Sequence, residues 1–240
     1  MSSMPSSAKA SLALYLLGFA ALATVLVAAV DYFQIQSNAG LSIAQLFLEG
    51  GFCMMALTLL GDRKAVLKSD PKSGQRIIMR YVFLIGFPAV IAPVIVLVLL
   101  LVLGAGHLLQ LQISALALSV LAGLVYFAMM VLAGLCLPGA LQQPADSLRT
   151  GFARSRRQIG ATLPRLLFFM APFAVAAFAL SVLLVVTGVI GSAPAGDLYR
   201  AAGELGGIFV VKLLSGLSIL GFCATVLAAH DKDLEEGHPA

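Results

Sequence analysis

Two ionisable residues stand inside long apolar runs of this sequence, and they are the first places where chemistry is expected. Glu49 lies in the run 39–60 and Lys212 in the run 207–229. A charge in hydrocarbon is costly unless it is paired or reaches water, so such residues mark functional sites or charge pairs. We predict a buried charge pair of Glu49 with Lys212. The alternative is a Lys212 side chain that snorkels to the headgroups and a Glu49 in a wet crevice.

A polar stripe leads to Glu49 along the same helical run. Ser42, Gln45 and Glu49 share one helical face, and Asn38 precedes them by one turn. Glu49 lies about 15 Å from the start of its run and Lys212 about 8 Å from the start of its own, at 1.5 Å per residue. A long lysine side chain spans that difference in depth. A proton relay or substrate site would need further polar groups at mid-membrane, and the sequence offers few.

Motifs for catalysis or cofactor binding are missing from the sequence. His107 stands in a connection, and His230 and His238 stand in a C-terminal tail whose acidic end, 231–236, is predicted to be solvated and disordered. No HExxH, GxSxG or Walker pattern occurs. No carboxylate cluster has metal-ligand spacing. We therefore expect a protein that is not an enzyme and that holds no metal and no cofactor.

The cysteines also argue for a structural role. Cys53, Cys136 and Cys223 all lie in apolar runs, their number is odd, and no CxxC spacing joins them. Such cysteines are predicted to be small packing residues.

The composition explains why Glu49, Lys212 and the three cysteines stand among apolar neighbours. Hydrophobic residues make up 60% of the 240 residues and charged residues 11%, with a mean hydropathy of +1.02. Soluble proteins carry roughly 25% charged residues. We therefore predict an all-α, polytopic membrane bundle with six transmembrane helices in a single domain. The predicted spans are 10–30, 39–60, 81–103, 113–137, 166–190 and 207–229.

Each of these runs exceeds the roughly 20 residues that cross a bilayer. The first run could be mistaken for a signal peptide. At 21 residues it is longer than the usual apolar core of about 7–15 residues, so we interpret it as a retained helix.

The basic residues predict an orientation. Of the 15 lysines and arginines, 13 lie at the two ends of the chain and in the connections 61–80 and 138–165. Six spans bring all four of these segments to one side, which the positive-inside rule makes the cytoplasm. The N-terminus and the C-terminus are both expected there. The net charge of +4 lies at membrane boundaries, so no nucleic acid partner is expected.

The second basic connection contains an amphipathic helix predicted over 146–163. Leu148, Phe152, Ile159 and Leu163 form an apolar stripe, and Pro164 is expected to end the helix. This layout predicts a helix in the membrane interface with its arginines among anionic lipid headgroups or against an acidic partner. The alternative is a topology anchor that also packs on the bundle. The arginines in question are Arg149, Arg154, Arg156, Arg157 and Arg165.

Prolines predict irregular helices. Pro88 and Pro172 should kink the third and fifth spans, and Pro93 should add a second break. The segments 80–90 and 165–175 align at an offset of 85 residues. They are interpreted either as two copies of a parallel hairpin repeat or as a coincidence of apolar residues. In the first basic connection, Asp70-Pro-Lys-Ser-Gly74 is interpreted as a turn.

A family resemblance rests on the residues around the amphipathic helix. Asp146–Arg157 and Leu163–Phe169 resemble a bacterial family of six-helix membrane proteins. That family is related to the membrane domain ahead of the catalytic domain in some glycerophosphodiester phosphodiesterases. The resemblance covers about 25 residues and the helix count. It implies a fold and a bacterial inner-membrane location but no enzymatic activity, since the chain has no room for a soluble phosphodiesterase domain.

Two classes of function follow. The first is a non-catalytic accessory, assembly or regulatory subunit that acts through lipid contacts and through helix–helix contacts with other membrane subunits or a second copy. The second is a small transporter or lipid-handling protein that uses the polar face around Glu49. A lipid-directed enzyme is favoured only by family analogy. A water-filled cavity that reaches Glu49 would favour the second class, whereas a flat apolar face of the first or fourth span buried against another chain would favour the first.

Overall fold

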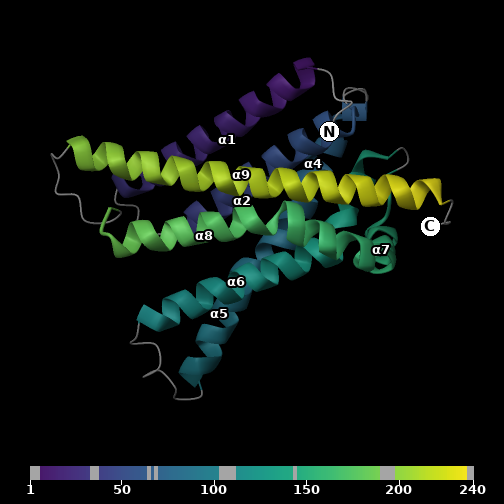
Figure 1. The fold of residues 1–240 in the computed structure, drawn as a ribbon. Helices are drawn as coiled ribbons and strands as arrows, with labels where there is room; N and C mark the ends of the chain where they lie inside the picture. The colour runs from purple at the N-terminus through teal and green to yellow at the C-terminus, as the bar shows by residue number, and fades with distance from the viewer. Residues whose placement is uncertain are drawn as a thin grey trace.

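The computed structural model describes residues 6–32, 38–63, 66–67, 70–102, 112–142, 145–189 and 198–236. These ranges fold into helices and contain no strand, which confirms the all-α fold class (Figure 1). The α-helices are α1 (Ser6–Tyr32), α2 (Asn38–Leu60), α4 (Pro71–Arg80), α5 (Phe87–Val102), α6 (Gln112–Ala133), α7 (Leu148–Phe169), α8 (Ala171–Val186) and α9 (Leu198–Glu235). The π-helix η1 (Tyr81–Gly86) joins α4 to α5, and the short 3-10 helices η3 (Gly134–Cys136) and η4 (Pro138–Leu141) follow α6.

The helices have the length and hydropathy of a multi-pass membrane protein. Among the described residues, five helical segments are long and apolar enough to cross a membrane. The pair α7–α8, bent by 44°, makes a sixth span if it is counted as one. The start of α1 and the end of α9 lie at the same end of the bundle as α7 (Figure 1). We call this end, which holds Arg63, Arg154 and Asp233, the polar end.

Helix α9 is the centre of the bundle. Helices α1, α2, α7 and α8 all pack on it, whereas α5 packs mainly on α6. The α5–α6 hairpin diverges from α8 and α9 away from the polar end (Figure 1). The core includes the fully buried side chains of Leu57, Tyr81, Met130, Leu166 and Phe222. The three cysteines are buried and free, as their sequence context predicts.

The third span begins earlier than its predicted first residue. The Asp70 carboxylate accepts a hydrogen bond from the Lys72 N–H (3.1 Å), and Pro71 occupies the first turn of α4. An aspartate cap followed by proline is a strong helix start, because proline lacks only a donor that the first turn leaves unused. The turn predicted at Asp70–Gly74 is therefore wrong, and a helical path runs from Pro71 to Val102.

The prolines of this path act differently from one another. The helix is irregular at Tyr81–Gly86, immediately ahead of Pro88, where it widens into the π-helix η1. Since Pro88 has no N–H, the carbonyl four residues before it loses its regular partner. Helix α5 continues through Pro93, so the second break predicted there does not interrupt the helix, and the kink at that residue stays a prediction.

The break before α8 lies closer to Pro172 than to Pro164. Helix α7 continues through Pro164 and ends at Phe169, so the helix end predicted at Pro164 is wrong. The 44° bend falls between α7 and α8, just before Pro172. Helix α9 contacts the chain at this break, where the Ser218 hydroxyl donates a hydrogen bond to the carbonyl of Met170 (3.3 Å).

The C-terminal tail is part of the central helix. Helix α9 extends to Glu235, which contradicts the disorder predicted for 231–236 over these described residues. His230 and Asp233 are 0% and 1% exposed. They face inward at the polar end, so the last turns of α9 are held by packing and charge.

The two segments of the suggested repeat have different surroundings. Arg80 donates from its two Nη atoms to the carbonyls of Cys136 and Asp146, at 2.6 Å each. Arg165 is exposed on α7. The repeat stays a prediction that rests on the alignment alone.

Candidate functional site: a lateral crevice with a carboxylate

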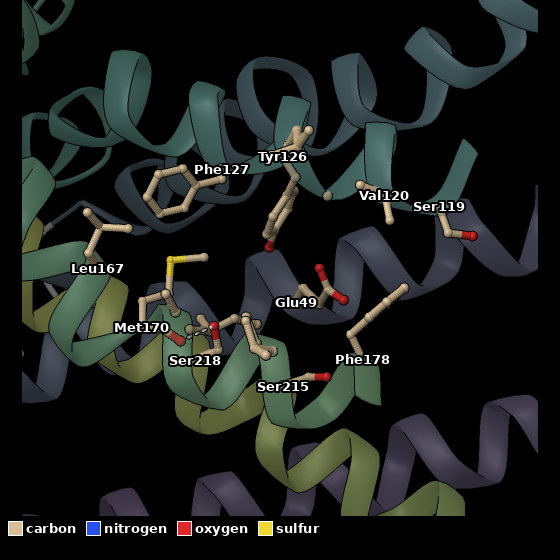
Figure 2. Close-up of a pocket in the computed structure, with 16 residues that line it drawn as sticks. Glu49, Ser119, Val120, Tyr126, Phe127, Leu167, Met170, Phe178, Ser215 and Ser218 are labelled. Carbon is tan, nitrogen blue, oxygen red and sulfur yellow. Dashed lines mark hydrogen bonds between the residues drawn. The ribbon is translucent and has the colours of Figure 1, made fainter. Parts of the chain in front are cut away.

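A crevice of about 610 Å³ opens where the α5–α6 hairpin diverges from α8. Small-molecule sites occupy about 300–1,000 Å³. Side chains from α6 and α8 form most of its apolar walls, and its polar groups come from α2, α6 and α9 (Figure 2). The lining residues used below are Val120, Leu124, Tyr126 and Phe127 of α6, Val175 and Phe178 of α8, Ser215 and Ser218 of α9, and Glu49 of α2.

Glu49 is the acidic group of the crevice. It stands eleven residues from each end of α2, so it lies about 16 Å from both ends, at the middle of the helix. Two neighbours donate to its carboxylate: Gln45 Nε2 to Oε1 (3.0 Å) and the Tyr81 hydroxyl to Oε2 (3.1 Å). These bonds orient the carboxylate and compensate part of the cost of burying it.

A second tyrosine connects this carboxylate to the crevice wall. Tyr126 lines the crevice and its hydroxyl is hydrogen-bonded to that of Tyr81. Because Tyr81 donates to Glu49, Tyr126 donates to Tyr81, and the three groups form one chain (Figure 2 shows Tyr126 reaching toward Glu49). Tyr81 is the first residue of the π-helix η1, and such turns are frequent at functional sites. Sequence analysis missed both tyrosines. Their one signal is a hydroxyl in a run that is otherwise apolar.

Lys212 lies near Glu49 without touching it. No nitrogen–oxygen distance between these two described residues falls within 4.0 Å, yet the carboxylate acts electrostatically on the ammonium group. The hydrogen-bond partners of Glu49 are Gln45 and Tyr81 instead. The Glu49–Lys212 charge pair stays a prediction. The side chains of Asn38 and Ser42, the upper part of the predicted stripe, lie outside the described residues.

A double-mutant cycle measures whether the two charges interact. We expect Lys212→Met alone to destabilise the protein more than Lys212→Met combined with Glu49→Gln. The single change leaves a carboxylate without its cation, whereas the double change removes both charges. The coupling energy is expected to be about 0.5–3 kcal/mol in detergent unfolding experiments. If the two effects simply add, the charges do not interact and the predicted pair is wrong.

A second polar cluster, between α7 and α9 at the polar end, corrects one predicted contact. Arg154 is only 3% exposed. Its Nε lies 2.9 Å from Asp233 Oδ2, its Nη1 pairs with Asp146, and Nη1 also donates to His230 Nε2 (3.2 Å). The headgroup or partner contact predicted for Arg154 is therefore wrong, because its charge is neutralised inside the protein.

The remaining arginines of α7 divide into two groups. Arg157 reaches Asp233 (3.3 Å) while keeping 37% of its side chain exposed. Arg149, Arg156 and Arg165 are exposed. The headgroup contact predicted for these three stays a prediction.

The most buried face of α7 is not its apolar stripe, although Phe152 of that stripe packs against the core. The buried positions are Gly151, Arg154, Ser155, Gln158, Thr162 and Leu166. Leu148, at the start of the apolar stripe, is 45% exposed. The polar face of α7 therefore packs on the protein. It contributes hydrogen bonds such as that from Gln158 Nε2 to Asp233 Oδ1 (3.5 Å).

The fold and the site together define a class: a multi-pass helical membrane protein with a lateral apolar crevice and a carboxylate at mid-depth. No family model, curated protein or solved structure matches this chain. The resemblance to the six-helix family accordingly stays a prediction.

Proposed function

We propose that this protein takes an amphiphilic molecule from the bilayer into the crevice between α6 and α8, as a lipid-handling protein or small transporter. The crevice that reaches Glu49 is the observation that supports this proposal. Several of its wall residues are also surface residues of apolar helices: Val120 is 45%, Leu124 64% and Phe178 40% exposed. A bilayer molecule therefore has direct lateral access.

The chemistry of the crevice fits a ligand with an apolar body and a polar head. The walls consist of aliphatic and aromatic side chains, which favour binding of an apolar molecule over a water-soluble solute. The polar groups of the crevice are the Glu49 carboxylate and the hydroxyls of Ser119, Tyr126, Ser215 and Ser218. A few convergent polar groups in an apolar pocket are typical of sites that orient an amphiphile.

This proposal chooses the second of the two expected function classes. An accessory subunit that acts through helix contacts needs complementary faces but no cavity. A half-buried carboxylate in the middle of an apolar helix costs free energy, and a role in binding explains why it stands beside a cavity. We keep the proposal non-catalytic: the site binds and orients, and no bond of the ligand changes.

We also propose the orientation and location of the protein. The polar end faces the cytoplasm of a bacterial inner membrane, because Arg63, Arg80 and the α7 arginines gather there. The exposed Arg149, Arg156 and Arg165 contact anionic headgroups on that side.

A photoreactive residue at Val120 tests the proposed binding. Replacing Val120 by benzoylphenylalanine and irradiating detergent-purified protein is expected to give an adduct of one defined mass, because a ligand held in the crevice survives purification. Gly123 lines the same wall, and a Cβ there would meet nothing within 4 Å. Gly123→Trp should therefore place its side chain in the crevice and abolish the adduct, as read by intact-protein mass spectrometry.

Matched controls separate occupancy from general lipid contact. Val94 is 52% exposed on α5 and does not line the crevice, so benzoylphenylalanine there should give no defined adduct. Gly206 of α9 also has open space around a Cβ, and Gly206→Trp should leave the Val120 adduct intact. Identical adducts at 120 and 94, or an adduct that persists in Gly123→Trp, would show that the crevice holds no ligand.

A further inference from the structure

We infer that the ligand of the crevice carries a positive charge: the site is built for a lipophilic cation or an amine amphiphile. This inference rests on the proposed function and names the ligand class for the same crevice. It starts from the charges around the cavity. Among the described lining residues, Glu49 and Tyr126 are the ionisable groups, and none is lysine, arginine or histidine.

The carboxylate is held by two hydrogen bonds and lines the crevice. An ionised carboxylate has about four acceptor positions on its two oxygens. Gln45 and Tyr81 each occupy one, and neither of these two residues lines the crevice. The positions that remain are available to a donor on the crevice side. A protonated amine supplies such donors together with the opposite charge.

Lys212 does not reverse this preference. It acts on Glu49 electrostatically, but it is not a lining residue. A ligand in the crevice therefore contacts the carboxylate, whereas the ammonium group does not line the cavity. Since charge–charge energy falls with distance, the nearer negative charge dominates in the crevice.

The walls favour the same ligand class. Tyr126, Phe127 and Phe178 place aromatic rings around the cavity, and ring faces attract cations at close range. A lipid with an anionic phosphate as its only charge would bring that charge to a carboxylate with no lining cation to compensate it. The crevice should therefore discriminate against anionic amphiphiles.

Two probes of nearly identical shape and opposite charge test the sign of the preference. Tetraphenylphosphonium and tetraphenylborate are bound to protein in phosphatidylcholine nanodiscs, and binding to the Gly123→Trp variant is subtracted to isolate the crevice component. The wild type should bind the cation about tenfold or more tightly than the anion. Glu49→Gln should remove that preference, and Glu49→Asp, which keeps the charge, should retain it.

Each outcome bears on one of the two proposals. Equal crevice binding of both probes by the wild type, or an unchanged cation preference in Glu49→Gln, overturns the charge inference. If the Val120 adduct still forms and Gly123→Trp still abolishes it, the proposed ligand binding stands without that inference. The folding control for Glu49→Gln is SDS unfolding followed by circular dichroism, because the Val120 adduct itself depends on ligand binding beside Glu49.

Discussion

Arg154→Ala is expected to lower the free energy of unfolding by about 3–5 kcal/mol, the usual cost of removing one partner from a buried ion pair. The replaced guanidinium contacts Asp146, Asp233 and His230. Asp233 is 1% exposed, so its charge would be left in a dry interface, with Arg157 and Gln158 as its remaining partners. The α7–α9 contact at the polar end should loosen first.

The control for this prediction is on the same helix. Arg156 is exposed, so Arg156→Ala removes the same charge and similar bulk without emptying a buried site and should cost less than about 0.5 kcal/mol. The measurement is unfolding of purified protein by SDS titration, followed by circular dichroism. Equal losses for the two variants would mean that Arg154 does not hold α7 to α9.

Gly221→Ala is expected to destabilise the protein by about 1–3 kcal/mol, and Gly221→Val by more. A Cβ at Gly221 would lie 2.8 Å from the carbonyl carbon of Phe169 and closer still to its oxygen. These are backbone atoms at the break between α7 and α8, so no side chain can rotate away. Helix α9 would have to separate from the break, and the hydrogen bond from Ser218 to Met170 would lengthen with it.

A second glycine of α9 makes the sign of this prediction a sharp test. A Cβ at Gly206 meets nothing within 4 Å. Gly206→Ala should therefore be neutral or stabilising by up to about 1 kcal/mol, because alanine is the better helix former. The pair is compared in the same SDS unfolding assay. A stabilising Gly221→Ala would contradict the close approach of the two backbones.

What sequence analysis predicts well is local. The apolar runs are long enough that composition alone indicates membrane helices, and Glu49 draws attention because its neighbours along the chain are apolar. The partners of Glu49 are different in kind. Tyr81 and Tyr126 come from other helices, 32 and 77 positions along the chain, and only the packing of η1 against α2 and α6 brings them to Glu49.

The amphipathic helix shows why a correct element can have one side chain placed wrongly. The apolar stripe of α7 predicts a helix in the membrane interface with all its arginines among the headgroups. In a membrane protein the apolar stripe can face lipid, and polar side chains need partners inside the protein. Arg154 therefore turns inward to Asp146 and Asp233.

Sequence analysis places the charged segment 231–236, at the end of α9, in solvent for a related reason. Its charged residues are typical of a disordered end when their partners are unknown. His230 and Asp233 continue the helical face of Phe222 and Val226, and all four are buried. That three- and four-residue spacing indicates a helix that extends past the apolar run. The spacing does not predict that Asp233 pairs with Arg154, which is distant in the sequence.

The adduct formed by benzoylphenylalanine at Val120 is the most direct test of a ligand-binding crevice beside Glu49. A wild-type background should give a single defined mass, and Gly123→Trp should remove it while Gly206→Trp keeps it. An absent adduct, or one shared with position 94, would contradict a ligand in this crevice.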